Sequence, residues 1–138
     1  MRILIIDAQG GGLGKQIITQ IRNNREGDTL IAVGTNSEAT NAMRKAGADI
    51  SATGENAVAV NARDADVIIG PIGIVIADSL YGEVTPRMAL SVAQSKATRL
   101  LIPINRCENF IIGISDLTIT SLIPMLLEKL AELDGQRA

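Results

Sequence analysis

The chain has 138 residues, of which 46% are hydrophobic and only 1% aromatic, and its formal charge at pH 7 is −2. This length suits one domain over residues 1–138 with an aliphatic core. The shortage of aromatic side chains argues against stacking on single-stranded nucleic acid, and the scattered Lys and Arg residues argue against binding duplex DNA or an anionic membrane. We therefore expect neither nucleic acid nor a membrane as a partner.

Cysteine and histidine usage narrows the setting and the chemistry. Cys107 is the only cysteine, so no intramolecular disulfide can form, which is typical of a reducing compartment. The apolar run at the N-terminus is too short for a secretory signal, and we expect a cytoplasmic protein. The chain has no His, the commonest general base and metal ligand, and no metal site is predicted.

Short apolar runs, typical of strands buried on both faces, alternate along the chain with stretches of helical periodicity. The pattern predicts, in chain order, a strand at 3–6, a helix at 13–24, a strand at 30–33, a helix at 39–46, a strand at 49–52, a helix at 55–62, a strand at 67–69, helices at 74–80 and 86–93, strands at 100–104 and 110–114, and a helix at 120–133. Thr35 and Glu38 have the spacing of a capping box for the second helix. Residues 135–138 are expected to form a frayed tail.

This alternation predicts an α/β fold. We expect a three-layer Rossmann-like domain with a mostly parallel central sheet of about five to six strands and helices on both faces. The stretch at 55–62 also alternates like a strand; we interpret it as a helix because two parallel strands need a crossover between them.

A glycine-rich turn follows the first predicted strand, where ligands bind in such sheets. Its residues are Gln9, Gly10, Gly11, Gly12, Leu13, Gly14 and Lys15. Glycines let backbone N–H groups approach an anion closely, and the helix that follows directs its N-terminus at the same place. The turn therefore predicts a site for a phosphate-bearing ligand, a nucleotide or dinucleotide being suspected.

The loop matches no single phosphate-binding pattern completely. The dinucleotide pattern G-x-G-x-x-G is met at Gly10 and Gly12, but Lys15 replaces its third glycine. The mononucleotide pattern is met at Gly14 and Lys15 but lacks its first glycine and its final hydroxyl residue. The loop also resembles the deviant loop of chromosome-partitioning ATPases, with Gly10 in place of the leading lysine. The alternative is that the glycines only make a tight turn, although four in five residues exceed what a turn requires.

Other candidate contacts follow the remaining strands: Thr35, Asn36, Gly70, Pro71, Ile72, Gly73, Asn105 and Arg106. Thr35 and Asn36 can bond a ribose or a phosphate, or simply cap a helix. No carboxylate follows the second strand, where an NAD site needs one for the ribose, so an ordinary NAD dehydrogenase is disfavoured. The turn at 70–73 can pack on a base or serve only as a turn.

The charged and nucleophilic candidates have several possible roles. Arg106 can pair with a phosphate, whereas Cys107 is interpreted as a small buried thiol. Asp7 and Lys15 could pair across the loop, or Lys15 could reach a phosphate. No catalytic dyad is marked by spacing, although Asp78 and Glu83 are further carboxylates near the expected crevice.

Five short segments together resemble a known family. They are DAQGGGLGK at 7–15, GTN at 34–36, TGEN at 53–56, GPIG at 70–73 and PINRC at 103–107. In this combination the chain is similar, over nearly its whole length, to short bacterial proteins grouped as a domain of unknown function. The resemblance implies a cytosolic, Rossmann-like stand-alone domain and implies no activity.

Three functions stay open. The first, which we favour, is a nucleotide- or phosphate-ligand-binding module with a regulatory or sensing role. The second is a small enzyme acting with a phosphorylated cofactor or substrate at a site completed by oligomerisation, where Asp78, Glu83 and Arg106 would react or position. The third is an interaction or assembly domain whose glycine loop is only a turn. Apolar residues at 72–76 and in the last helix further predict a homodimer.

Overall fold

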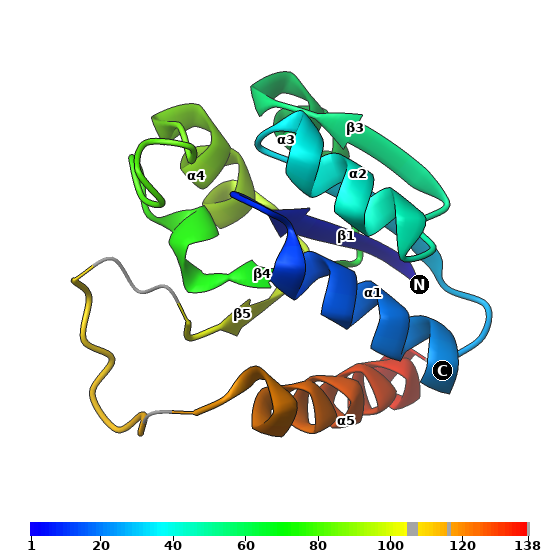
Figure 1. Cartoon of the computed structure of the whole chain (residues 1–138). Helices are drawn as coiled ribbons and strands as arrows, with labels where there is room; N and C mark the ends of the chain where they lie inside the picture. The colour runs from blue at the N-terminus through cyan, green and yellow to red at the C-terminus, as the bar shows by residue number, and fades with distance from the viewer. Residues whose placement is uncertain (105–107, 116, 138) are drawn as a thin grey trace.

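The computed structural model describes residues 1–104, 108–115 and 117–137 (Figure 1). Its strands are β1 (Arg2–Asp7), β2 (Thr29–Gly34), β3 (Ile50–Thr53), β4 (Val67–Pro71) and β5 (Thr98–Ile102). Its helices are α1 (Gly12–Asn24), α2 (Ser37–Lys45), α3 (Glu55–Asp64), α4 (Pro86–Gln94) and α5 (Ile119–Arg137), and one 3₁₀ turn, η1 (Ile72–Val75), follows β4.

The five strands form one parallel sheet in the order β3-β2-β1-β4-β5. β1 lies at its centre, with Ile5 aligned to Ala32 of β2 on one side and to Ile69 of β4 on the other. The predicted α/β fold is therefore confirmed, with a sheet that is entirely parallel in the part described.

Helices cover both faces of the sheet, so the central strands are buried on both sides. Ile3 and Ile5 of β1 pack in a cluster with α1, α5 and Met43 of α2. Leu4 and Ile6 point the other way, into a cluster with α3 and α4. The two layers are visible on either side of β1 in Figure 1. This alternation explains why the strands read as continuous apolar runs in the sequence.

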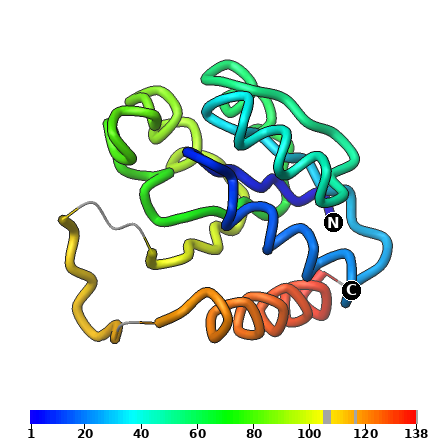
Figure 2. The backbone as a smooth tube through the Cα atoms, in the orientation of Figure 1, coloured from blue at the N-terminus to red at the C-terminus, as the bar shows by residue number. Residues whose placement is uncertain are grey.

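The predicted strand at 110–114 is wrong. Phe110 is 85% exposed and Ile112 94% exposed, and Gly113 has a φ of 88°. Too few residues separate this run from β5 for the crossover that a further parallel strand requires. Figure 2 shows the described part of this segment running away from the sheet before α5 begins.

The predicted helix at 74–80 is also wrong. Only the 3₁₀ turn η1 is helical there, and Asp78, Leu80 and Tyr81 have φ values of 64°, 56° and 58°. Residues in this left-handed region cannot continue a right-handed helix. The apolar periodicity of the run instead reflects a tight loop that buries Leu80 and Val84.

The tail predicted to fray is helical through residue 137. Arg137 forms an ion pair with Asp66 at 2.8 Å, and Asp134 forms one with Arg25 at 2.8 Å. These contacts hold the end of α5 against the edge of the sheet where β1 and β4 begin.

The strand order creates a switch point between β1 and β4. These strands are neighbours, yet α1 and α4, which follow them, lie on opposite faces. The loops that leave Asp7 and Pro71 therefore diverge at the carboxyl edge of the sheet. Ligands of open α/β sheets bind at such points, and the glycine loop lies at this one because it follows Asp7.

Candidate functional site

Asp7 anchors the glycine loop from beneath. It is the last residue of β1, is 5% exposed, and accepts hydrogen bonds from the N–H groups of Ala8 at 2.8 Å and Gly14 at 2.7 Å. Burial raises the pKa of Asp7 above its usual range, these two hydrogen bonds oppose the rise, and the nearby Glu83 carboxylate adds to it. Both oxygens hold backbone, and the described residues include no ion pair between Asp7 and Lys15, so that predicted pairing is absent.

Two of the loop glycines are explained by packing. Gly11 has a φ of 74°, and a Cβ built there would lie 2.8 Å from both the Cα and the carbonyl oxygen of Ala39. A Cβ on Gly14 would lie 2.5 Å from Sδ of Met43. These residues let α1 approach α2 closely. A larger side chain at Gly11 would press on the backbone of α2, whereas one at Gly14 would displace the buried Met43 side chain.

The other two loop glycines have no such explanation. A Cβ on Gly12 would meet nothing within 4 Å, and a Cβ on Gly10 would meet only Oε1 of Glu38, at 3.9 Å. Both residues are exposed, and neither has a left-handed φ. The N–H groups of Gly10, Gly12 and Leu13 have no hydrogen-bond partner among the described residues. Open donors at the start of α1 thus coincide with glycines that the protein itself does not need.

A groove of about 560 Å³ adjoins the loop at Gly10, between the first turn of α1 and one side of α2. Its lining residues are Gly10, Lys15, Ser37, Glu38, Asn41, Ala42 and Lys45. Lys15 and Lys45 supply positive charge, while Glu38 is the single acidic residue of the set. The groove therefore has the size and the charge to receive an anionic group next to the open N–H groups.

Asn36, directly after β2, connects the first two loops. Its Oδ1 accepts a hydrogen bond from the N–H of Ala39 at 2.9 Å, which makes it the N-cap of α2. The predicted capping box of Thr35 and Glu38 is therefore wrong by one residue. The Nδ2 atom of Asn36 donates to the carbonyl oxygen of Gln9 at 3.0 Å, so a residue predicted as a ligand contact fixes the glycine loop.

Glu83, from the loop before α4, lies at the same place. Its Oε1 accepts from the N–H of Gln9 at 2.9 Å, from Oγ1 of Thr35 at 2.9 Å and from Nδ2 of Asn36 at 2.6 Å. Partial burial works to raise the pKa of Glu83, but these three hydrogen bonds together bring it below its usual range. A charged carboxylate thus joins the loops after β1 and β2.

The sequence indicates Glu83 only as a further carboxylate near the expected crevice and does not place it beside Thr35. No carboxylate directly follows β2 in the chain, and the structure supplies one from 48 residues further along than Thr35. Glu83 follows no strand directly and belongs to no motif. Only the arrangement of the switch point brings it to Thr35, and no local pattern in the sequence carries that information.

The turn at 70–73 is occupied by internal contacts. Gly70 and Pro71 complete β4, and a Cβ on Gly70 would lie 2.5 Å from the carbonyl oxygen of Ile6. The carbonyl oxygen of Gly73 accepts a hydrogen bond from the Ser79 hydroxyl. Gly70, Pro71 and Gly73 are buried and Ile72 is half-buried, which favours the turn alternative over a ligand contact.

Three sequence candidates, Asn105, Arg106 and Cys107, lie outside the described residues. Within the described ranges, no group of three or more His, Cys, Asp or Glu residues is arranged to hold a metal ion. No helix in these ranges is long and apolar enough to span a membrane.

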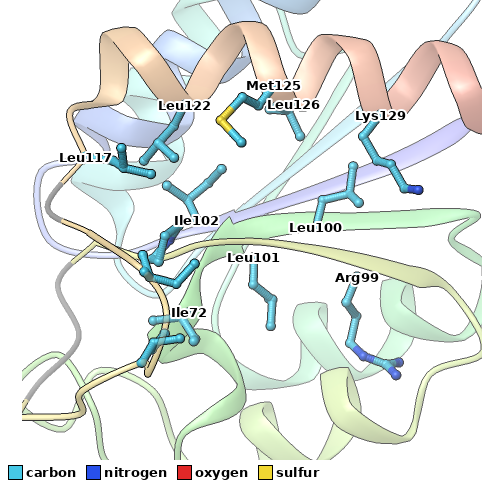
Figure 3. Close-up of a pocket in the computed structure, with 13 residues that line it drawn as sticks. Ile72, Arg99, Leu100, Leu101, Ile102, Leu117, Leu122, Met125, Leu126 and Lys129 are labelled. Carbon is cyan, nitrogen blue, oxygen red and sulfur yellow. The ribbon is translucent and has the colours of Figure 1, made fainter.

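A second groove, of about 420 Å³, lies between β5 and α5. In Figure 3, Leu100, Leu122 and Met125 lie between the strand and the helix, whereas Leu101 and Arg99 project from the opposite side of β5. The lining is almost entirely aliphatic, and Arg99 is bonded to carbonyl oxygens at the end of α4 and after it. This groove offers apolar surface and no cradle for phosphate.

The chain belongs to a family defined as a domain of unknown function, DUF3842, whose model matches residues 2–134. No curated protein matches it. Among solved structures it is similar to a dodecameric FMN-dependent UbiX-like decarboxylase from Escherichia coli O157:H7, with 20% identity and a TM-score of 0.47 over 95% of this chain and 77% of the other. A likeness of this degree does not carry a ligand or an activity from one protein to the other.

Proposed function

We propose that the chain is a binding module for a nucleotide or a related phosphate-bearing ligand, held by the glycine loop at the start of α1. One observation carries the proposal. Of the four loop glycines, Gly11 and Gly14 are required by packing, while Gly10 and Gly12 border open space beside three N–H groups without partners in the described structure. A phosphate in that space would accept those hydrogen bonds, and a Cβ would obstruct it.

The surrounding charges support an anionic ligand. Lys15 is exposed at the first turn of α1 and lines the adjoining groove together with Lys45. The positive end of the α1 dipole acts at the same place. Backbone N–H groups and lysines at one place can together hold an anion through charge-assisted hydrogen bonds.

A regulatory or sensing role suits these contacts better than catalysis. Asp7, the buried carboxylate with a raised pKa, uses both oxygens to hold backbone N–H groups and so has none left for a substrate. The enzyme alternative would therefore need groups from elsewhere in an oligomer. The assembly alternative would leave Gly10 and Gly12 without a reason to be glycine.

The test replaces Gly12 with Asp and measures thermal unfolding by circular dichroism, with and without inorganic pyrophosphate or ADP. Aspartate is favourable in the first turn of a helix, so Gly12→Asp is expected to fold normally. A ligand present at about 100 times its Kd stabilises the wild type by roughly 2.7 kcal/mol. This corresponds to an increase in Tm of roughly 5–10 °C, and Gly12→Asp should abolish it by charge repulsion.

Gly135→Asp is the matched control, because it adds the same charge to α5 at an exposed glycine with open space around it. The control should retain the full increase in Tm. If neither pyrophosphate nor ADP changes the Tm of the wild type, the proposed function is wrong and the assembly alternative takes its place.

A further inference from the structure

Glu83 presents two oxygens in different situations. Oε1 accepts three hydrogen bonds, from Gln9, Thr35 and Asn36, whereas Oε2 accepts none from any residue that the structure describes. Because the three donors come from two different loops, they fix the orientation of the carboxylate. One oxygen is thus held by the protein, and the lone pairs of the other are used by none of the described residues.

The charge around Glu83 differs from that around the open N–H groups. The hydrogen bonds to Oε1 keep Glu83 ionised, and the Asp7 carboxylate lies close enough for the two charges to interact. The Glu83 carboxylate, one oxygen of which is bonded to no described residue, attracts hydroxyl donors and repels a phosphate placed next to it. Lys15 and Lys45 line, with Gly10, a groove to which Glu83 does not contribute. The site therefore has one end that suits an anion and one that suits neutral hydroxyl groups.

We propose that Glu83 is a specificity-determining residue that accepts hydrogen bonds from the ribose 2′,3′-diol of a nucleotide and rejects a phosphate at the 2′ position. This inference rests on the proposed function, since the diol needs a phosphate held by the glycine loop. A vicinal diol supplies two adjacent O–H donors to the available oxygen. The same chemistry is offered by a ribityl chain or a sugar phosphate, and we assign the ribose of a nucleotide because the glycine loop precedes a helix at the switch point.

The first test compares ligands on the unmodified protein by isothermal titration. ADP is expected to bind 10- to 100-fold more tightly than 2′,3′-dideoxy-ADP, which is about what a hydrogen bond to a charged acceptor contributes. NAD is likewise expected to bind more tightly than NADP, because the 2′-phosphate would face Glu83. Equal affinities within each pair would overturn the inference, and this comparison needs no variant to fold.

The second test uses Glu83→Gln, which turns the available acceptor into an amide of similar shape. It should weaken ADP by the same factor that separates ADP from its dideoxy analogue, leave dideoxy-ADP unchanged, and narrow the difference between NAD and NADP. Glu128→Gln, an exposed glutamate on α5, is the matched control and should change none of these affinities. Equal weakening of ADP and dideoxy-ADP would show a merely structural role and overturn the inference.

Further ligands separate the sources of the diol and the two proposals. FMN and ribose 5-phosphate are tested in the same way. If either binds more tightly than ADP and is weakened as much by Glu83→Gln, the assignment to the ribose of a nucleotide is overturned in favour of that ligand. Binding of pyrophosphate and ADP without dependence on the diol would overturn this inference alone. Absence of binding by every one of these ligands would overturn the proposed function, and the inference with it.

Discussion

Packing requires a glycine at position 11 but not at position 12. Replacing each of these adjacent residues with Ala tests this difference. Gly11 has a φ of 74°, and Gly11→Ala places a Cβ 2.8 Å from two backbone atoms of α2, the Cα and the carbonyl oxygen of Ala39. Gly12→Ala places the same atom where nothing lies within 4 Å. The two variants therefore differ in environment and not in composition.

The expected magnitudes follow from these contacts. The left-handed conformation costs an alanine roughly 1–2 kcal/mol, and overpacking against backbone adds roughly 1–3 kcal/mol because backbone atoms cannot rotate away. We expect Gly11→Ala to lower the free energy of unfolding by about 2–5 kcal/mol and the Tm by roughly 6–20 °C. Gly12→Ala should stay within about 0.5 kcal/mol of the wild type, as for other exposed positions.

Thermal and urea unfolding followed by far-ultraviolet circular dichroism measure both quantities, a suitable method because the chain has no Trp. The slope of the urea transition checks that the compared states are the same. The Tm values of Gly11→Ala and Gly12→Ala are expected to differ by several degrees. A difference of less than about 2 °C would refute the steric distinction between the two glycines. Gly12 would then not differ sterically from Gly11, and it would no longer mark a ligand site.

Further outcomes are expected at other positions. Asp28→Asn should cost roughly 3 kcal/mol at pH 7, because it leaves the Arg25 guanidinium, 11% exposed, without its buried counter-charge. Partial burial acts to raise the pKa of Asp28, but Arg25 and the N-terminal ammonium outweigh it and lower the pKa. The stability that the ionised Asp28 contributes is complete above about pH 4 and is lost as the pH falls through its folded-state pKa. Urea unfolding should therefore show that the difference in unfolding free energy between the wild type and Asp28→Asn becomes smaller in acid. Asp134→Asn, which removes a half-exposed partner of the same guanidinium, should cost less than about 1 kcal/mol; an equal cost would contradict the role given to burial. Thr40→Val should lower the unfolding free energy by about 1–3 kcal/mol in the same assay, since the N–H of Gly34 donates to its hydroxyl in a buried position, and an unchanged midpoint would refute this. The homodimer predicted from the apolar surface is checked by light scattering at high concentration, where a monomer mass would rule it out.

Most of the fold could be predicted from the sequence, because its signals are local. Continuous apolar runs such as 3–6 mark strands buried on both faces, and the spacing of Ile17, Ile18 and Ile21 marks the buried side of α1. The run at 110–114 has the same composition as a strand, yet its side chains stay exposed. Apolar content alone does not show whether the connection from the preceding strand is long enough for such a run to pair with the sheet.

The candidate site was predictable only in part. The glycine loop is visible in the sequence because its residues are adjacent, but the sequence does not separate Gly11, which packs on Ala39, from Gly12, which packs on nothing. The sequence places Glu83 near the expected crevice, but it does not predict the hydrogen bonds that Glu83 accepts from Gln9, Thr35 and Asn36. These contacts depend on four left-handed residues before Glu83, which are Asp78, Leu80, Tyr81 and Gly82, and on the strand order, both of which are properties of the folded chain.

The hydrogen bond between Gln9 and Glu83 also has a consequence for how the protein folds. It closes a loop of 74 residues, so it can form only after β4 has joined β1 and the chain beyond it has turned back. Contacts between residues so distant in sequence form late, because the entropy of closing the loop must first be overcome. The βαβ unit of β1, α1 and β2 can thus assemble early, before its loops form their hydrogen bonds with Glu83. Pulse-labelling hydrogen exchange during refolding would show this as protection of the β1 amides before that of Gln9.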